Sequence, residues 1–188
     1  MHCRFTSNKY FSFHFHFHIL DADGLRNFII LNHSQYNLVH EGMQSKERYF
    51  TLPNQSINDI PNDIQHLYFC RFMNYDEDKL IFTNYSFHQL KSISIVYGCF
   101  KNVREFVLDG LERLESVKID GDCFLLDIEK RDDGICRITN CPNLIQLEMG
   151  DESFYDFKSF ELSNLNSIQS IKFGDYCFEY SDFSLKGE

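Results

Sequence analysis

The sequence predicts a mainly β solenoid with two short strands in each coil of about 24 residues and little helix. Three observations carry this prediction. The first is a phenylalanine that ends each of four similar segments, in steps of 24, 30 and 24 residues: Phe100, Phe124, Phe154 and Phe178. The second is that each segment holds two stretches of alternating apolar and polar residues, and the third is that only short polar links join them. A fixed period in this range is typical of a solenoid.

The longer alternation in each repeat predicts a strand with one buried face. Val117 and Ile119 alternate with the polar Ser116 and Lys118, which is the period of a half-buried strand. The equivalent segments are 90–95, 144–149 and 168–173. A shorter alternation recurs at 106–108, 136–138, 160–162 and 183–185.

The links between the two strands are too short for helices. Only five residues separate Phe100 from Phe106, and again Phe154 from Phe160. An isolated helical turn is costly to nucleate, so we expect a flat coil of two sheets. One coil buries too little apolar surface to offset the entropy of ordering it, and stacking must therefore supply the stability.

The repeats resemble the leucine-rich repeat, closest to its short BspA-like type. The pattern L-x-x-L-x-I is followed by a Gly- and Asp-rich turn and then by Cys-Phe or Ser-Phe, over about residues 82–188. The resemblance implies a leucine-rich-repeat-type solenoid and a protein-interaction role. The position that usually holds a stacked Asn is occupied otherwise, so we expect no Asn ladder there: Gly98, Asp122, Glu152 and Tyr176.

The 188 residues are expected to form three parts. Residues 1–20 are a Phe- and His-rich segment of low complexity, and residues 21–60 hold N-terminal strands (28–31 and 49–52) and a cap. Residues 61–188 form the solenoid, beginning with a degenerate coil at Ile64, Leu67 and Phe69 and interrupted by an insertion within 125–134. The last residues open another coil, so we expect the solenoid to be truncated at its C-terminus and to expose an apolar edge there.

Cysteine and histidine give no compelling metal or redox motif. Cys99, Cys123 and Cys177 share one column of the repeat with Ser153, which we interpret as packing, with disulfides between coils as the alternative. His14, His16 and His18 would share one face of a strand and could bind a transition metal, although a biased, low-complexity start is the simpler interpretation. We expect no cofactor and no metal site.

Composition and motifs limit the function classes. A net charge of -10 argues against a nucleic-acid binder. The phosphate-binding, zinc-protease and nucleophile-elbow motifs are absent from the sequence, so no catalytic residue is assigned and no enzyme is expected. An enzyme using Cys136 or the His-rich start is the weakest hypothesis. No stretch approaches the length of a membrane-spanning helix, and we expect a cytoplasmic protein, or a cell-surface one if the full gene carries a signal.

The leading hypothesis is a non-enzymatic protein-binding module with an as yet unidentified protein partner. Its candidate site is the outward face of the longer strands, where two columns form: Ser92, Ser116, Gln146 and Ser170, beside Ser94, Lys118, Glu148 and Lys172. The alternative is a surface or structural repeat protein, such as an adhesin-like fragment of a longer array. Self-association through the uncapped C-terminal edge is a further expectation.

Overall fold

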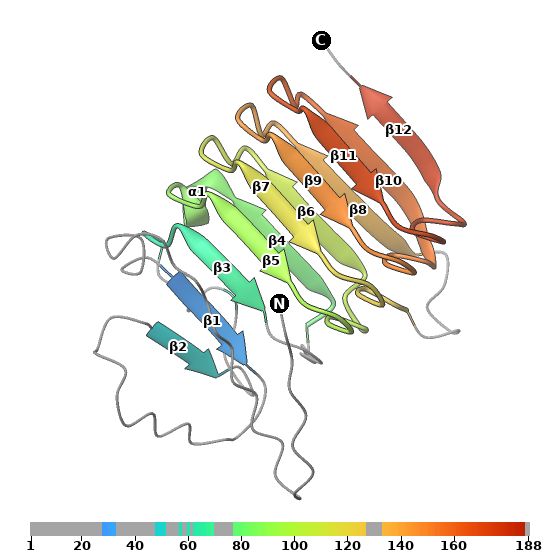
Figure 1. The fold of residues 1–188 in the computed structure, drawn as a ribbon, viewed down its shortest axis with the longest axis horizontal. Helices are drawn as coiled ribbons and strands as arrows, with labels where there is room; N and C mark the ends of the chain where they lie inside the picture. Colours follow the sequence, from blue (N-terminus) through green and yellow to red (C-terminus); the bar gives the residue numbers. More distant parts are fainter. Residues whose placement is uncertain are drawn as a thin grey trace, which may run out of the picture.

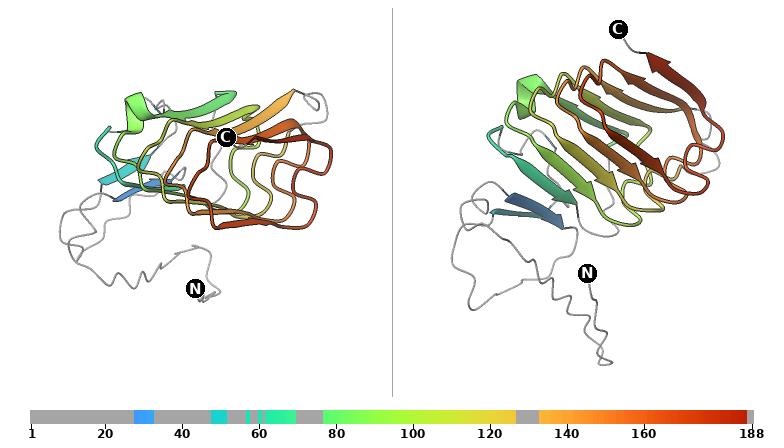
Figure 2. Two further views of the ribbon diagram at one scale, coloured as in Figure 1. Left: turned by 90° about the horizontal axis from the view of Figure 1, so that it is seen from above. Right: turned by 45° about the horizontal axis from the view of Figure 1, so that its top comes forward.

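In the part of the chain that the structure describes, the coils form a stack in which every strand pairing is parallel. The computed structural model describes residues 28–32, 48–51, 57, 60, 62–69, 77–126 and 133–186. Within these ranges the coils build two sheets that face each other as two layers (Figures 1 and 2). The predicted mainly β solenoid with two short strands per coil is confirmed, and the helix α1 (Asn84–Phe87) is a single turn.

The major sheet has seven strands in the order β11-β9-β7-β5-β3-β1-β2. It contains the longer alternations of the repeat together with two strands from the N-terminal part of the chain. Its members are β1 (Phe28–Asn32), β2 (Arg48–Thr51), β3 (His66–Phe69), β5 (Ser92–Ile95), β7 (Ser116–Ile119), β9 (Gln146–Met149) and β11 (Ser170–Phe173).

The minor sheet has five strands in the order β12-β10-β8-β6-β4. Its strands are the shorter alternations, extended by one to three residues at their ends. They are β4 (Lys79–Thr83), β6 (Glu105–Asp109), β8 (Gly134–Thr139), β10 (Phe157–Ser163) and β12 (Asp182–Lys186). The extension is largest in β10, where the register against β8 shifts between Phe157 and Ser159.

The apolar side chains of both sheets point between the layers and stack in columns. In the major sheet Ile93 pairs with Val117 and Val117 with Leu147, and all three are at most 1% exposed. In the minor sheet Phe82 pairs with Leu108 in the same way, and both are fully buried. Each coil therefore covers the core of its neighbour, as the energetics of a single coil require.

One corner of every coil is turned by a phenylalanine in a left-handed backbone conformation. The φ angle lies between 56° and 61° at Phe100, Phe124, Phe154 and Phe178. Residues other than Gly, Asn and Asp seldom adopt this region. The rings of Phe124 and Phe154 stack at 4.4 Å, and those of Phe154 and Phe178 at 4.8 Å. These distances match the spacing of about 4.8 Å between hydrogen-bonded strands, so a stack of coils is also a stack of rings.

Backbone hydrogen bonds continue the sheet ladders around this corner. The N–H of Phe124 donates to the carbonyl of Cys99 at 2.9 Å, and that of Phe154 donates to the carbonyl of Cys123 at 3.0 Å. The small residue before each phenylalanine adds a side-chain bond: Ser153 Oγ donates to the carbonyl of Asp120 at 2.9 Å, and Cys123 Sγ to that of Val96 at 3.4 Å. A hydroxyl and a thiol thus serve the same position, which explains why Ser replaces Cys there.

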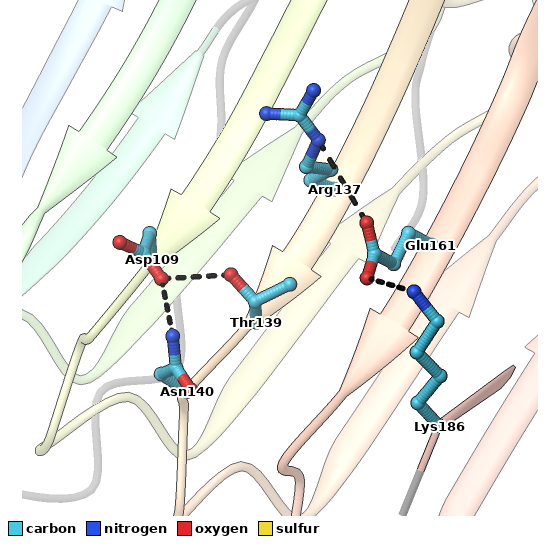
Figure 3. Close-up of polar contacts among 6 residues, drawn as sticks. All are labelled: Asp109, Arg137, Thr139, Asn140, Glu161 and Lys186. Carbon is cyan, nitrogen blue, oxygen red and sulfur yellow. Dashed lines mark hydrogen bonds and ion pairs between the residues drawn. The ribbon is translucent and has the colours of Figure 1, made fainter. Parts of the chain in front are cut away.

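The opposite corner carries a polar ladder that the sequence analysis missed. Gly110, Asn140 and Asn164 adopt positive φ at equivalent positions. Asn164 Nδ2 donates to Asn140 Oδ1 at 2.7 Å. Asn140 Nδ2 in turn donates to Asp109 Oδ1 at 2.8 Å (Figure 3). An amide ladder therefore exists in this protein, but after the minor-sheet strands and not in the turn where such a ladder was considered.

The packing of the Phe corner predicts how much stability the protein loses when the Phe154 ring is removed. Phe154 is fully buried and contacts the rings of Phe124 and Phe178 on its two sides. Phe154→Ala should lower the free energy of unfolding by about 3–5 kcal/mol, measured by urea denaturation. The control is Tyr85→Ala, since Tyr85 is 94% exposed and its loss should change stability by less than about 0.5 kcal/mol. Equal stabilities of the two variants would contradict the stacked Phe column.

Candidate functional site

The eight residues of the candidate site lie in two straight columns on the outer face of the major sheet. The register pairs Ser92 with Ser116, Gln146 and Ser170 in turn, and pairs Ser94 with Lys118, Glu148 and Lys172. All eight side chains are exposed or half-buried. The geometry that the sequence predicted is therefore present, while the binding role of these residues stays a prediction.

The charged column is partly neutralised within the face. Lys172 Nζ lies 2.6 Å from Glu148 Oε1, across one strand pairing. The hydrogen bond from Lys172, helped by Gln146, lowers the pKa of the Glu148 carboxyl, which therefore stays ionised. Such an exposed pair contributes little to stability, so these side chains remain adaptable at small cost to the fold.

Strand β3 continues the register of both columns, but Tyr68 is only 8% exposed, so His66 alone adds an accessible side chain. His66 pairs with Ser92 and Tyr68 with Ser94, and His66 Nδ1 lies 2.7 Å from Ser92 Oγ. Burial, followed by the charge of Lys91, lowers the pKa of His66, so the ring is neutral at pH 7. The sequence could have revealed this extension, because Leu67 and Phe69 point inward and leave His66 and Tyr68 on the outer face.

An open depression of about 740 Å³ lies where β7, β9 and β11 end and the repeat turns begin. Acidic residues outnumber basic ones in its lining, which holds five carboxylates and two lysines: Asp120, Asp122, Glu148, Asp151 and Glu152, with Lys118 and Lys172. Tyr97, which is 38% exposed, donates a hydrogen bond to Asp122 at its edge. The charged column, through Lys118, Glu148 and Lys172, thus borders an anionic hollow, which the sequence analysis did not anticipate.

Glycines let the turns that line this hollow pack backbone against backbone. A Cβ added at Gly150 would lie 2.5 Å from the amide nitrogen of Gly121, and one added at Gly174 would lie 2.4 Å from that of Asp151. Neither contact tolerates a side chain. The Asp175 N–H also donates to Asp151 Oδ1 at 2.9 Å, so the hollow has a floor of closely packed backbone.

The described residues contain no group of three or more His, Cys, Asp or Glu arranged to hold a metal ion. His14, His16 and His18 lie outside the described residues, as does most of the insertion predicted within 125–134.

The cysteines of the described part are free thiols in apolar packing positions. They are Cys99, Cys123, Cys136, Cys141 and Cys177. Burial raises the pKa of Cys123 to about 12 and that of Cys141 to about 11, and it raises the pKa of Cys136 strongly. A protonated, buried thiol is a poor nucleophile and a poor metal ligand, so chemistry at Cys136 has no support in this geometry.

Comparisons with known proteins give no match: no family model, no curated protein and no solved structure corresponds to the chain. The resemblance to the leucine-rich repeat and to its BspA-like type stays a prediction. Among the described residues, none of the helical segments has the length and apolar character needed to cross a lipid bilayer.

The burial of the cysteine side chains predicts that they are protected from alkylation in the folded protein. At pH 8 the folded protein should react with iodoacetamide at Cys123, Cys136 and Cys141 at least about tenfold more slowly than the urea-unfolded chain. Peptide mapping by mass spectrometry resolves the individual sites. Unfolding frees thiols that ionise near their ordinary pKa of 9.0, so stability should fall as the pH rises above about 9. Rapid labelling of Cys136 in the folded state would contradict the packing described above.

Proposed function

We propose that this chain is a non-enzymatic protein-binding module and that the outer face of the major sheet is its recognition surface. The observation that carries the proposal is the pair of register-aligned polar columns, held on a rigid stack of parallel strands and open to solvent. Repeat proteins commonly bind partners on such regular extended surfaces.

The chemistry of this face indicates the kind of partner that it fits. Its columns offer hydroxyl, amide, ammonium and carboxylate groups, and the exposed fractions of Lys118 and Lys172 place both ammonium groups in solvent. An extended segment that sets a carboxylate over these lysines and a basic side chain over the anionic hollow would meet complementary charge along its length. The binding would be modest and salt-dependent, because the face has no large apolar anchor.

We also propose a reducing compartment such as the cytoplasm. Free thiols placed in a core column support this location, because proteins of oxidising compartments usually pair their cysteines. A cell-surface or structural role is the alternative, and a signal or anchor encoded in the full gene would favour it.

Charge reversal on the face tests the proposed function. Peptides that tile the proteome of the source organism are displayed on phage and selected against the wild-type chain. The selected peptides should bind Lys118→Glu/Lys172→Glu at least about tenfold more weakly, since each reversal turns an attraction into a repulsion. Fluorescence anisotropy at two salt concentrations measures this loss.

The matched control reverses two exposed lysines elsewhere, Lys101 and Lys158. Binding to Lys101→Glu/Lys158→Glu should stay close to wild type, because both variants change the net charge equally. Peptides that lose the same affinity for both variants would show that net charge, and not the position of the lysines, causes the loss. Peptides that bind all three proteins equally would move the site off this face.

A further inference from the structure

The C-terminal end of the described stack exposes side chains that belong to core columns. Ile171 and Phe173 of β11 are 39% and 41% exposed, whereas Leu147 and Met149, one coil earlier in the same columns, are 0% and 2% exposed. In the minor sheet the contrast is larger. Phe183 and Leu185 of β12 are 56% and 66% exposed, against 1% and 0% for Phe160 and Leu162 of β10.

At the opposite end of the minor sheet, the inward-facing side chains are buried. Leu80 and Phe82, the inward residues of β4, are 1% and 0% exposed. A head-to-tail contact would therefore set the open apolar end of one molecule against an end whose core residues are already covered. The surface that matches the open end best is the same open end of another molecule.

The sequence of β12 is self-complementary in the antiparallel sense. It reads Asp182-Phe-Ser-Leu-Lys186, so an acidic, an apolar, a polar, an apolar and a basic residue follow one another. If two such strands pair antiparallel about Ser184, Asp182 faces Lys186 of the second copy, and Phe183 faces its Leu185. Directly opposite residues of an antiparallel pair share one face, so both apolar pairs stay on the core side and both charge pairs stay outside.

We propose that two copies of this chain associate end to end through their C-terminal edges, with β12 pairing antiparallel to β12 about a two-fold axis at Ser184. Within the described residues β12 pairs with β10 alone, so its other edge has backbone donors and acceptors to offer. The contact is isologous and closes at two copies. It sets Phe183 beside Leu185 of the second copy, and it caps an edge that would otherwise invite uncontrolled pairing.

Lys186 lies on the outer face of the minor sheet, where its ammonium group turns toward β10, the strand on the side of β12 away from the proposed contact. Its Nζ lies 3.3 Å from Glu161 Oε1 on the outer face of the minor sheet, and Glu161 also lies 3.8 Å from Arg137 through its other oxygen (Figure 3). In the dimer, the ammonium group would lie between Glu161 of its own chain and Asp182 of the second copy. This arrangement extends the pattern of ion pairs that already links neighbouring strands.

Charge exchange at the two ends of β12 tests the proposal. Sedimentation velocity over a concentration series should give a dimer for the wild-type chain. Lys186→Asp sets like charges against each other at both symmetric positions, as does Asp182→Lys, and each should weaken the dimer at least about tenfold. The double variant Asp182→Lys/Lys186→Asp restores both pairs between copies, and its dimer constant should return to within about threefold of wild type.

The design separates the contact between copies from the contact within one chain. Residue 186 remains acidic beside Glu161 in the double variant, so recovery there can only come from the second copy. Lys158→Asp, an exposed change on the neighbouring strand β10, is the matched control and should dimerise like wild type. Circular dichroism establishes that each variant is folded. A wild-type chain that stays monomeric, one that grows without limit, or a folded double variant that fails to recover would overturn the proposal.

Discussion

The structure depends on a corner that a phenylalanine turns with its backbone in the left-handed region. That conformation costs roughly 1–2 kcal/mol for an L-residue, and it recurs at Phe100, Phe124, Phe154 and Phe178. Burial of each ring, stacking on its neighbours and a backbone hydrogen bond to the previous coil offset this cost. All three gains exist only when coils are stacked in register. The corner therefore couples the conformation of one coil to the presence of the next.

This coupling explains why one molecule presents two such different surfaces. Along the face of the major sheet, translation from coil to coil repeats outward positions and produces the polar columns. At β12, the last described strand, Phe183 and Leu185 occupy positions that are buried in the preceding coils, yet here they are exposed to solvent. The face is thus suited to a partner that reads polar groups. The end is suited to a partner that adds a strand, and in the proposed dimer the second copy of β12 would do this with charges related by the two-fold axis.

Much of the fold was predictable because repetition averages out local ambiguity. The segment Ser116–Ile119 alone is a weak strand signal, but its counterparts in register make the two-sheet coil and the outward columns clear. The left-handed Phe corner was not predictable, since propensity assigns that conformation to Gly or Asn. The ladder through Asp109, Asn140 and Asn164 was missed because the known pattern drew attention to the other corner. The anionic hollow depends on the backbone contact between Gly121 and Gly150, which no linear pattern reports.

The six extra residues of the third repeat have a consequence for engineering this protein. They enter between Leu126, which is buried, and Gly134, where β8 begins, yet Phe124 and Phe154 on either side form the tightest ring stack of the column at 4.4 Å. The added length therefore leaves the ring stack on either side of it intact. Fluorophores, affinity tags or whole domains would be grafted here, because a length difference of six residues already occurs at this position, whereas the Gly-lined turns leave no space for a side chain.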